Sequence, residues 1–341
     1  MTIRYTQSEL EFKHPFTISK GTKTHQPALL VELGHFALRG YGEAPAISYY
    51  NISVQDMIAD IDRKKVFLEK FAFSDPERYW HYLHHLYPKD PFLVCALDMA
   101  AWDIYGKIKQ APLYKLWKLE MVHAPLTDLT IGIDTPENMI RRIHENPWPI
   151  YKIKVGMPGD IELIKTIRKE TGSVLRVDAN GGWTYDEAME KLPILADLGI
   201  ELVEQPITPS SPEEMKRLFA DSPLPLIADE SCVAEEHVLK CVGMFHGVNI
   251  KLTKCGGITP ARRMIDKARE LGLSVMLGCM NESAIGSAAL VHLAPLCDHL
   301  DVDGPLLLAE DNASGISYDA GKVRPSGMPG LGITLKPGIF V

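Results

Sequence analysis

The sequence predicts an α/β protein, with a (β/α)8 barrel of the TIM type and an α+β capping domain at its amino terminus. Three observations predict this class. From about residue 125, eight short apolar runs rich in β-branched residues recur about every 25 residues. Stretches with the periodicity of an amphipathic helix lie between most of these runs. The preceding part of the chain instead has predicted strands followed by predicted helices, which is typical of an α+β domain.

The eight runs give the predicted barrel strands. Each is short and largely apolar, as expected for parallel strands that are buried on both faces. A doubly wound open sheet is the alternative, but it normally has fewer strands, so the even count favours the barrel. The runs cover residues 129–133, 151–155, 174–179, 201–205, 225–229, 248–252, 274–278 and 299–303.

The connections between these runs carry helix signals. Residues 159–172 and 184–199 place apolar side chains along one helical face. Thr259 followed by Pro260 predicts another helix start, with the threonine as N-cap and the proline as the first helical residue.

Residues 1–118 form the predicted capping domain, and residues 119–317 form the predicted barrel. The tail, from about residue 318 to residue 341, is rich in proline and glycine and is expected to complete the cap by packing back on it. Within the cap, two segments predict antiparallel strands, 2–12 and 28–44, and three predict helices, 53–71, 76–86 and 92–110.

The composition excludes several classes of function. The chain of 341 residues has a net charge of −8 and a pI of about 5.9, so it lacks the basic surface of a nucleic-acid-binding protein. No apolar run reaches the length needed to span a membrane, and the amino terminus shows no secretory signal. The six cysteines form no CxxC pair. Reduced thiols and a cytoplasmic location are therefore expected.

Polar residues gather where the predicted strands end, which is where such barrels carry their catalytic groups. Asp178, Glu204 and Asp229 follow three consecutive strands and are expected to converge. Three carboxylates without histidine or cysteine form a hard oxygen ligand set, which favours Mg²⁺, or alternatively Mn²⁺, over zinc. The remaining strand ends contribute Lys152, Lys154, Lys251, Glu282, Asp301 and Asp303.

The lysines lie on both sides of the predicted carboxylate cluster in strand order. Lys152 and Lys154 precede it, and Lys251 follows it. Lysines near a metal and near one another are expected to have lowered pKa values, which would make a neutral lysine available as a base. Bases on opposite faces of one α-carbon permit racemisation or epimerisation. Lys254 is expected on the other strand face from Lys251, which makes Lys251 the better candidate.

Several motifs together resemble one family. They are "KIK" (152–154), "VDANGGW" (177–183), "VEQP" (203–206), "ADES" (228–231) and "NIKLTKCGG" (249–257), with "HPFTIS" and "YGEAP" in the cap and "PGLGI" near the end. The chain resembles the enolase superfamily, muconate-lactonizing subgroup, and within it the dipeptide epimerases of the L-Ala-D/L-Glu epimerase type.

This resemblance implies an isomerase that inverts the α-carbon of the C-terminal residue of a dipeptide, such as Ala-Glu, by 1,1-proton transfer through an enediolate. It implies that Asp178, Glu204 and Asp229 bind one Mg²⁺ per subunit. Lys154 and Lys251 would be the acid/base catalysts, and Lys152 would hold the substrate carboxylate. The resemblance further implies recycling of cell-wall peptides and assembly into a homo-oligomer.

The "DVD" motif separates this activity from the alternatives, which are an o-succinylbenzoate synthase or a muconate-type cycloisomerase using the same lysines and metal. In dipeptide epimerases an Asp-x-Asp at this place binds the α-ammonium of the dipeptide, and Asp301 and Asp303 match it. Two carboxylates on one face suit an ammonium, whereas a substrate without a cation would find them unfavourable. A barrel that binds a ligand without catalysis is a third hypothesis.

The residues that would contact the side chain of the substrate are less defined. Where related epimerases that prefer glutamate carry an arginine after "PF", this chain has Gly21, flanked by Lys20 and Lys23. Either lysine could meet an acidic side chain, whereas Tyr50, in a second cap loop, could pack against an apolar one. Cys279 and Glu282 are expected to line the same pocket.

Overall fold

Eight parallel strands form one sheet whose spatial order follows the sequence. A parallel bridge between Thr127 and Leu300 joins its two edges, so that the sheet closes into a barrel. The predicted fold class is therefore confirmed in this computed structural model, which describes residues 1–340. The strands are β4 Leu129–Ile131, β5 Ile150–Lys154, β6 Val174–Asp178, β7 Ile200–Glu204, β8 Leu226–Ala228, β9 Gly247–Ile250, β10 Ser274–Gly278 and β11 His299–Asp301.

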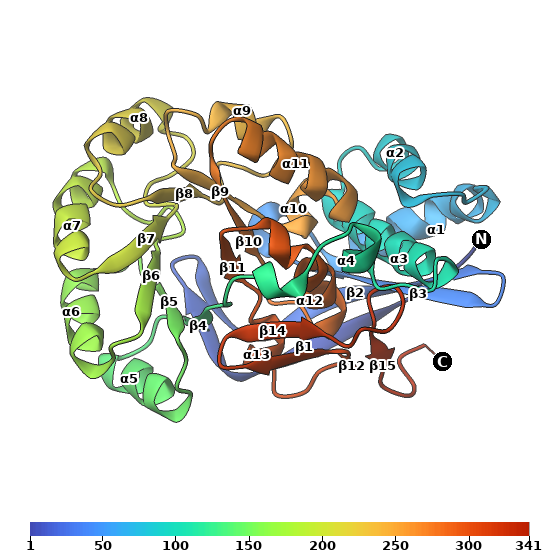
Figure 1. Cartoon of the computed structure of the whole chain (residues 1–341), viewed down its shortest axis with the longest axis horizontal. Coiled ribbons are helices and arrows are strands. Elements are labelled where there is room, and N and C mark those ends of the chain that lie inside the picture. Colours follow the sequence, from blue (N-terminus) through green and yellow to red (C-terminus); the bar gives the residue numbers. More distant parts are fainter. Residues whose placement is uncertain (341) are drawn as a thin grey trace.

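Helices follow the strands and cover the outside of the barrel, as the curved row from α5 to α9 shows (Figure 1). Local signals set their ends. For example, Thr184 and Glu187 form a reciprocal capping box at the start of α7. The barrel helices are α5 Pro136–Glu145, α6 Asp160–Glu170, α7 Tyr185–Asp197, α8 Pro212–Asp221, α9 His237–Lys240, α10 Leu252–Cys255, α11 Ile258–Glu270, α12 Ala284–Leu293 and α13 Gly304–Leu307.

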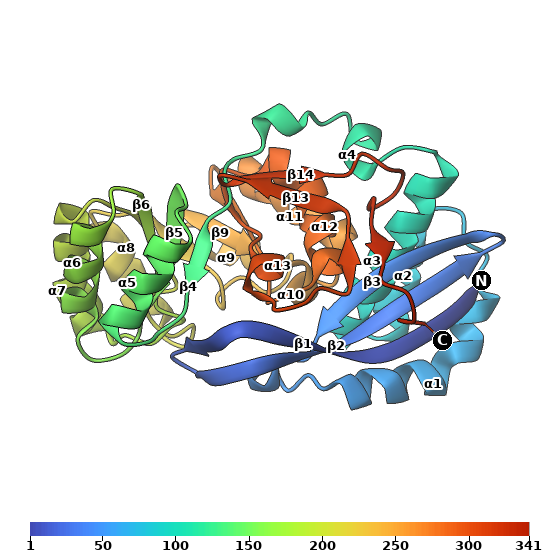
Figure 2. The same ribbon diagram turned by 90° about the horizontal axis from the view of Figure 1, so that it is seen from below.

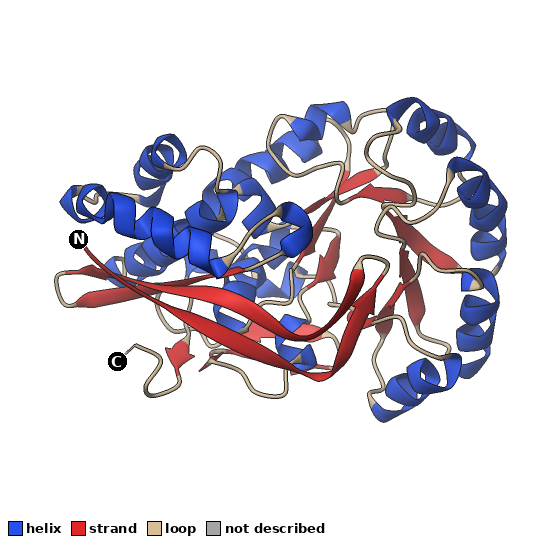
Figure 3. Cartoon of the chain, turned by 180° about the vertical axis from the view of Figure 1, so that it is seen from behind, coloured by secondary structure: helices blue, strands red, loops and turns tan. Residues whose placement is uncertain are grey.

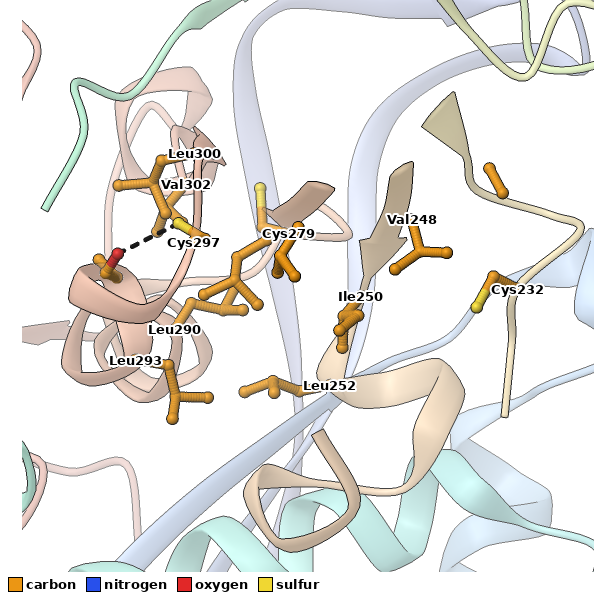
Figure 4. Packing of buried hydrophobic residues seen from close by; sticks show 14 of the residues in the cluster. Cys232, Val248, Ile250, Leu252, Cys279, Leu290, Leu293, Cys297, Leu300 and Val302 are labelled. Atoms are coloured by element: carbon orange, nitrogen blue, oxygen red, sulfur yellow. Dashed lines mark hydrogen bonds between the residues drawn. The ribbon is translucent and has the colours of Figure 1, made fainter. Parts of the chain in front are cut away.

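The main core lies between the strands and this helical layer. Figure 4 shows a part of it, where Val248 and Ile250 of β9, Leu290 and Leu293 of α12 and Leu300 of β11 gather. All ten residues of α12 are buried, because this helix is apolar all round and also contacts the cap and the tail. This arrangement fixes the strands whose ends carry the polar residues.

The cap combines an antiparallel sheet with three helices. The strands β1 Thr2–Ile18, β2 Gly21–His35 and β3 Leu38–Pro45 pair in that order, and the long β1–β2 ribbon extends along the barrel (Figures 2 and 3). The helices are α1 Val54–Lys70, α2 Pro76–Leu86 and α3 Pro91–Ile108, followed by the short α4 Leu113–Leu116. At Gly40 and Gly42 the β3 backbone lies so close to α3 that a Cβ atom would overlap helix carbonyl groups.

The tail contains four short strands, β12 Ala313–Ser314, β13 Ile316–Asp319, β14 Lys322–Pro325 and β15 Thr334–Leu335. Its contacts with the cap include a hydrogen bond and a ring stack. The Leu331 N–H donates to Asp103 of α3 at 2.8 Å, and the ring of Phe340 stacks on Tyr41 of β3 with 6.1 Å between centroids. The tail therefore packs on the cap at these residues.

The cap also supplies acceptors to barrel helices. Asp98 of α3 accepts the Thr259 N–H at 2.9 Å and the Thr259 hydroxyl at 2.7 Å. The prediction that Thr259 is an N-cap is wrong, because α11 begins at Ile258, two residues before Pro260, and its N-cap is Gly257. The acid at this helix start comes from the cap instead. Among the described helices, none has both the length and the apolar character needed to cross a lipid bilayer.

Candidate active site at the carboxyl ends of the strands

The register of the barrel strands aligns the polar residues at their ends. Lys154 pairs with Asp178 across β5 and β6, and Asp178 pairs with Glu204 across β6 and β7. Lys152 lies two residues before Lys154, so both lysines point to the same face of β5, toward the barrel interior. All four side chains are buried.

Lys152 is surrounded by carboxylates from three other strands. Its Nζ lies 2.7 Å from Glu204 Oε2, 2.7 Å from Asp301 Oδ2 and 3.2 Å from Asp178 Oδ2. Burial alone would lower the pKa of Lys152, but the neighbouring acids, Asp301 foremost, outweigh it and raise this pKa well above its usual value. Two like charges on one buried strand face are tolerated because opposite charges converge there.

The other two predicted lysines contact the outer members of the carboxylate cluster. Lys154 Nζ lies 2.5 Å from Asp178 Oδ2, and Lys251 Nζ lies 2.9 Å from Asp229 Oδ2. One lysine comes from β5 and the other follows β9, so they lie on opposite sides of the acids carried by β6, β7 and β8. The arrangement provides two ammonium groups with a cluster of carboxylates between them.

The expected lowering of the lysine pKa is not found at Lys251. Burial acts in that direction, but Asp229 and Glu204 outweigh it and raise the pKa of Lys251 well above its usual value. The expectation assumed a cation that shares the charge of these carboxylates. With lysines as their partners, the acids instead stabilise the protonated amine.

Lys254 reaches the site, and the prediction that it faces away is wrong. Strand β9 ends at Ile250, and Leu252–Cys255 form a helical turn, so a residue three positions after Lys251 returns to the same side. Lys254 Nζ lies 2.5 Å from Asp229 Oδ1 and 2.6 Å from the Asp229 carbonyl oxygen. The helix-ending "GG" at 256–257 is the signal that could have revealed this turn.

An acidic corner lies at the end of β11. The Asp303 carboxylate accepts the Thr130 N–H at 2.5 Å and the Cys279 thiol at 3.6 Å. The ligand atoms of Cys279, Asp301 and Asp303 lie within 4.8 Å of one another. Burial raises the pKa of Asp303 to about 6, and the charge of Asp301 adds to the rise. Asp301 Oδ1 is buried without a hydrogen-bond partner among the described residues. This Asp301 oxygen is therefore available to accept a hydrogen bond from a cationic group.

The cap closes the site from above. Lys20, in the β1–β2 turn, forms an ion pair of 2.8 Å with Glu230 and lies 4.5 Å from the ring centroid of Tyr49. The cavity that Lys154 and Lys251 line is small, with a volume of about 40 Å³. It is lined by Phe16, Ile18, Tyr49, Thr130, Lys154, Asn180, Lys251, Cys279, Met280, Asn281, Asp301 and Asp303.

Four predicted pocket residues are not part of this lining. Tyr50 packs against Phe92 at 5.9 Å between ring centroids, whereas its neighbour Tyr49 lines the cavity. Lys23 donates to Gln26 at 3.0 Å within the cap. Glu282 is buried, and burial together with Glu43 of β3 raises its pKa to about 8. Lys20 meets Glu230 at the edge. The choice between two adjacent tyrosines depends on the turn geometry of residues 48–51, which the sequence pattern did not resolve.

Asp178, Glu204 and Asp229 have the donor chemistry for a divalent cation, because they are buried and offer oxygen ligands alone. Lysines contact all three acids, and the described carboxylates whose ligand atoms gather within 4.8 Å, together with the Cys279 thiol, are instead Asp301 and Asp303. Burial and the nearby Asp178 and Asp229 raise the pKa of Glu204 to about 7 in spite of Lys152. Four lysines offset the charge of the three acids, so a hard cation bound by these oxygen ligands would share them with the lysines.

Comparison with known proteins gives the same assignment for both parts of the chain. Residues 1–117 match the N-terminal domain of the mandelate racemase / muconate lactonizing enzyme family, and residues 135–339 match the enolase C-terminal domain-like family. The L-Ala-D/L-amino acid epimerase of Flavobacterium johnsoniae is 45% identical over 335 residues, which cover 98% of this chain and 100% of the relative.

Solved structures of dipeptide epimerases have the same fold. The substrate-liganded L-Ala-D/L-Glu epimerase of Bacillus subtilis has a TM-score of 0.92 at 29% identity, covering 98% of both chains. The dipeptide epimerase of Enterococcus faecalis, complexed with Mg and L-Leu-L-Tyr, has a TM-score of 0.89 at 31% identity, covering 98% of this chain and 99% of that one. The chain therefore belongs to the enolase superfamily, with both domains of the mandelate racemase and muconate lactonizing enzyme type, and is an enzyme of the isomerase class.

Proposed function

We propose that the protein is a Mg²⁺-dependent dipeptide epimerase that inverts the α-carbon of the C-terminal residue by 1,1-proton transfer. The observation that carries this proposal is the pair Lys154 and Lys251 on opposite sides of the carboxylate cluster, beside the acidic corner of Asp301 and Asp303. The likeness to named dipeptide epimerases supports it.

Each lysine has one task in this reaction. One amine takes the α-proton from its face of the carbon, and the ammonium of the other returns a proton from the opposite face, which inverts the configuration. Lys152 stays protonated because acids surround it, so it stabilises negative charge on the substrate carboxylate throughout. Asp301 and Asp303 hold the α-ammonium and thereby place the C-terminal residue between the two lysines.

Asp178, Glu204 and Asp229 would hold the Mg²⁺, with Mn²⁺ as an alternative. When bound, the cation would act as a Lewis acid toward the substrate carboxylate and would share the carboxylate charge that otherwise keeps the lysines protonated. The Mg in the Enterococcus faecalis dipeptide complex supports the choice of Mg²⁺ as the cation.

Deuterium exchange tests the proposal. The protein with Mg²⁺ is incubated with a set of dipeptides in D₂O, and the α-proton of the C-terminal residue is followed by NMR. We expect loss of this signal together with interconversion of the diastereomers. Absence of exchange in every dipeptide, with folded and metal-loaded protein, would refute the proposal. Turnover of carboxylates without an amine would then favour the synthase or cycloisomerase activity.

Two variants assign the lysines. Lys154→Met and Lys251→Met should each lower the rate of epimerisation at least about 10²-fold. Each should still permit exchange of the α-proton in one diastereomer only, because one base remains. Lys165→Met is the matched control, since Lys165 is exposed on α6 and pairs with Glu162 far from the site. Equal exchange of both diastereomers in both variants would contradict the two-base assignment.

A further inference from the structure

A second cavity lies beside the catalytic one, at the seam of the barrel. It has a volume of about 170 Å³ and is enclosed by the bend of β1, the edge strand β4, helix α5 and the short helix α13. Most of its wall is apolar, and its apolar members are Phe12, Pro15, Phe16, Leu129, Ile131, Trp148, Leu306 and Leu307. The proposed reaction uses none of these side chains.

The two cavities share part of their walls. Phe16 and Thr130 line both of them. The N–H of Thr130 donates to Asp303, one of the two acids proposed to hold the α-ammonium of the substrate. The second cavity therefore adjoins the amino-terminal end of a bound dipeptide, whereas the reacting α-carbon belongs near Lys154 and Lys251.

The sizes of the two cavities differ in a way that matters for a substrate. The catalytic cavity, at about 40 Å³, has space for only a few water molecules. The second cavity, at about 170 Å³, exceeds the roughly 150 Å³ of an apolar cavity that is known to bind benzene. A side chain attached to the α-carbon that carries the ammonium could extend past Phe16 into this larger space.

The wall also carries polar side chains, which are Lys13, His14, Thr130, Arg142 and Asn146. Arg142 of α5 lines the cavity, and its charge is balanced by Asp134 at 2.5 Å through Nη2. Its Nε–H, however, is buried without an acceptor among the described residues. Because this nitrogen has almost no accessible surface, it does not face the cavity, and a side chain placed there would contact mainly the apolar members of the wall.

We propose that this cavity is the subsite for the side chain of the N-terminal residue of the dipeptide, and that it selects large apolar side chains. Phe16 forms the boundary between the two cavities. Its ring stacks on Phe12 at 5.6 Å, just after the register of β1 and β2 shifts between Glu11 and Phe16. This inference rests on the proposed epimerase function.

The test compares two dipeptides that differ only in their first residue, L-Ala-L-Leu and L-Phe-L-Leu, by their kcat/KM for epimerisation. In the wild type we expect a Phe-to-Ala ratio of one or more. Leu306→Trp fills the cavity and should lower this ratio at least about tenfold, since steric changes in apolar pockets have effects of this size. Leu239→Trp, on the exposed surface of α9, is the matched control and should leave the ratio unchanged.

A second variant keeps the test informative if Leu306→Trp does not fold. Phe16→Ala removes the boundary and should raise the Phe-to-Ala ratio. Turnover of the Ala dipeptide with a ratio far below one, unaffected by either cavity variant, would overturn the subsite and leave the epimerase function standing. Absence of turnover with both dipeptides, and with any other, would overturn both.

Discussion

Removal of the buried ammonium of Lys152 should destabilise the fold far more than removal of an exposed lysine with an equally short ion pair. Lys152 is 1% exposed and lies within 3.2 Å of three carboxylates. Lys152→Met leaves these acids without their partner in a buried place. Loss of one partner of a buried ion pair typically costs about 3–5 kcal/mol.

Lys165→Met provides the comparison. Lys165 Nζ lies 2.7 Å from Glu162, the same distance as the closest pairs of Lys152, but the two side chains are 41% and 76% exposed. Exposed pairs of this kind contribute about 0.2–1 kcal/mol. The two variants therefore separate the effect of burial from the effect of contact distance.

The assay is urea unfolding at pH 7 in the presence of a chelator, followed by circular dichroism and tryptophan fluorescence. Coincidence of the two transitions establishes whether a single free energy of unfolding applies. We expect Lys152→Met to lose several times more stability than Lys165→Met. Equal losses in the two variants would refute the reasoning that burial determines the cost.

Four further outcomes follow from the structure. Mg²⁺ at about 100 times its dissociation constant should stabilise the protein by about 2.7 kcal/mol, and Asp229→Asn should remove most of this gain in thermal melts. Burial lowers the pKa of His292 to about 4. Protonation of this histidine therefore leaves the free energy of unfolding unchanged above about pH 6.5 and lowers it as the pH falls from 6.5 toward 4. That loss is at most about 3 kcal/mol, and His292→Gln should flatten the pH dependence of urea unfolding over this window. Thr184→Ala, which breaks the capping box of α7, should cost about 1 kcal/mol in the same assay, whereas no loss would contradict the role of the cap. Lys20→Met should lower kcat/KM for Ala-Glu more than for Ala-Leu, and equal effects would exclude contact between Lys20 and the substrate side chain.

The barrel could be predicted because its strands are buried on both faces. Such strands are short apolar runs, and their regular recurrence marks a parallel sheet closed by helices. The position of the site followed from the same rule, since polar residues at strand ends have few structural reasons to be there. Lys152 and Lys154 stood out for this reason.

Other contacts could not be predicted, because they depend on residues far apart in the sequence. Asp98 and Thr259 are separated by 161 positions, and no periodicity relates them. Lys254 was misplaced because the strand ends earlier than the apolar run suggests, and a helical turn then reverses the direction of the side chain. The second cavity arises where β1 meets β4 and α13, and no local pattern marks such a junction.

The hydrogen bonds that Asp98 accepts from the start of α11 have a consequence for how this enzyme can be recombined with its relatives. Gly257 has a φ of +123°, and a Cβ atom at this position would overlap the Asp98 carboxylate. The second glycine of "KCGG" and an acid in the cap therefore constrain each other across the domain boundary. A chimera that exchanges the cap alone must inherit an aspartate at this place, or the Thr259 N–H and hydroxyl at the start of the barrel helix lose their acceptor. Exchange of both domains together keeps the glycine and the aspartate matched.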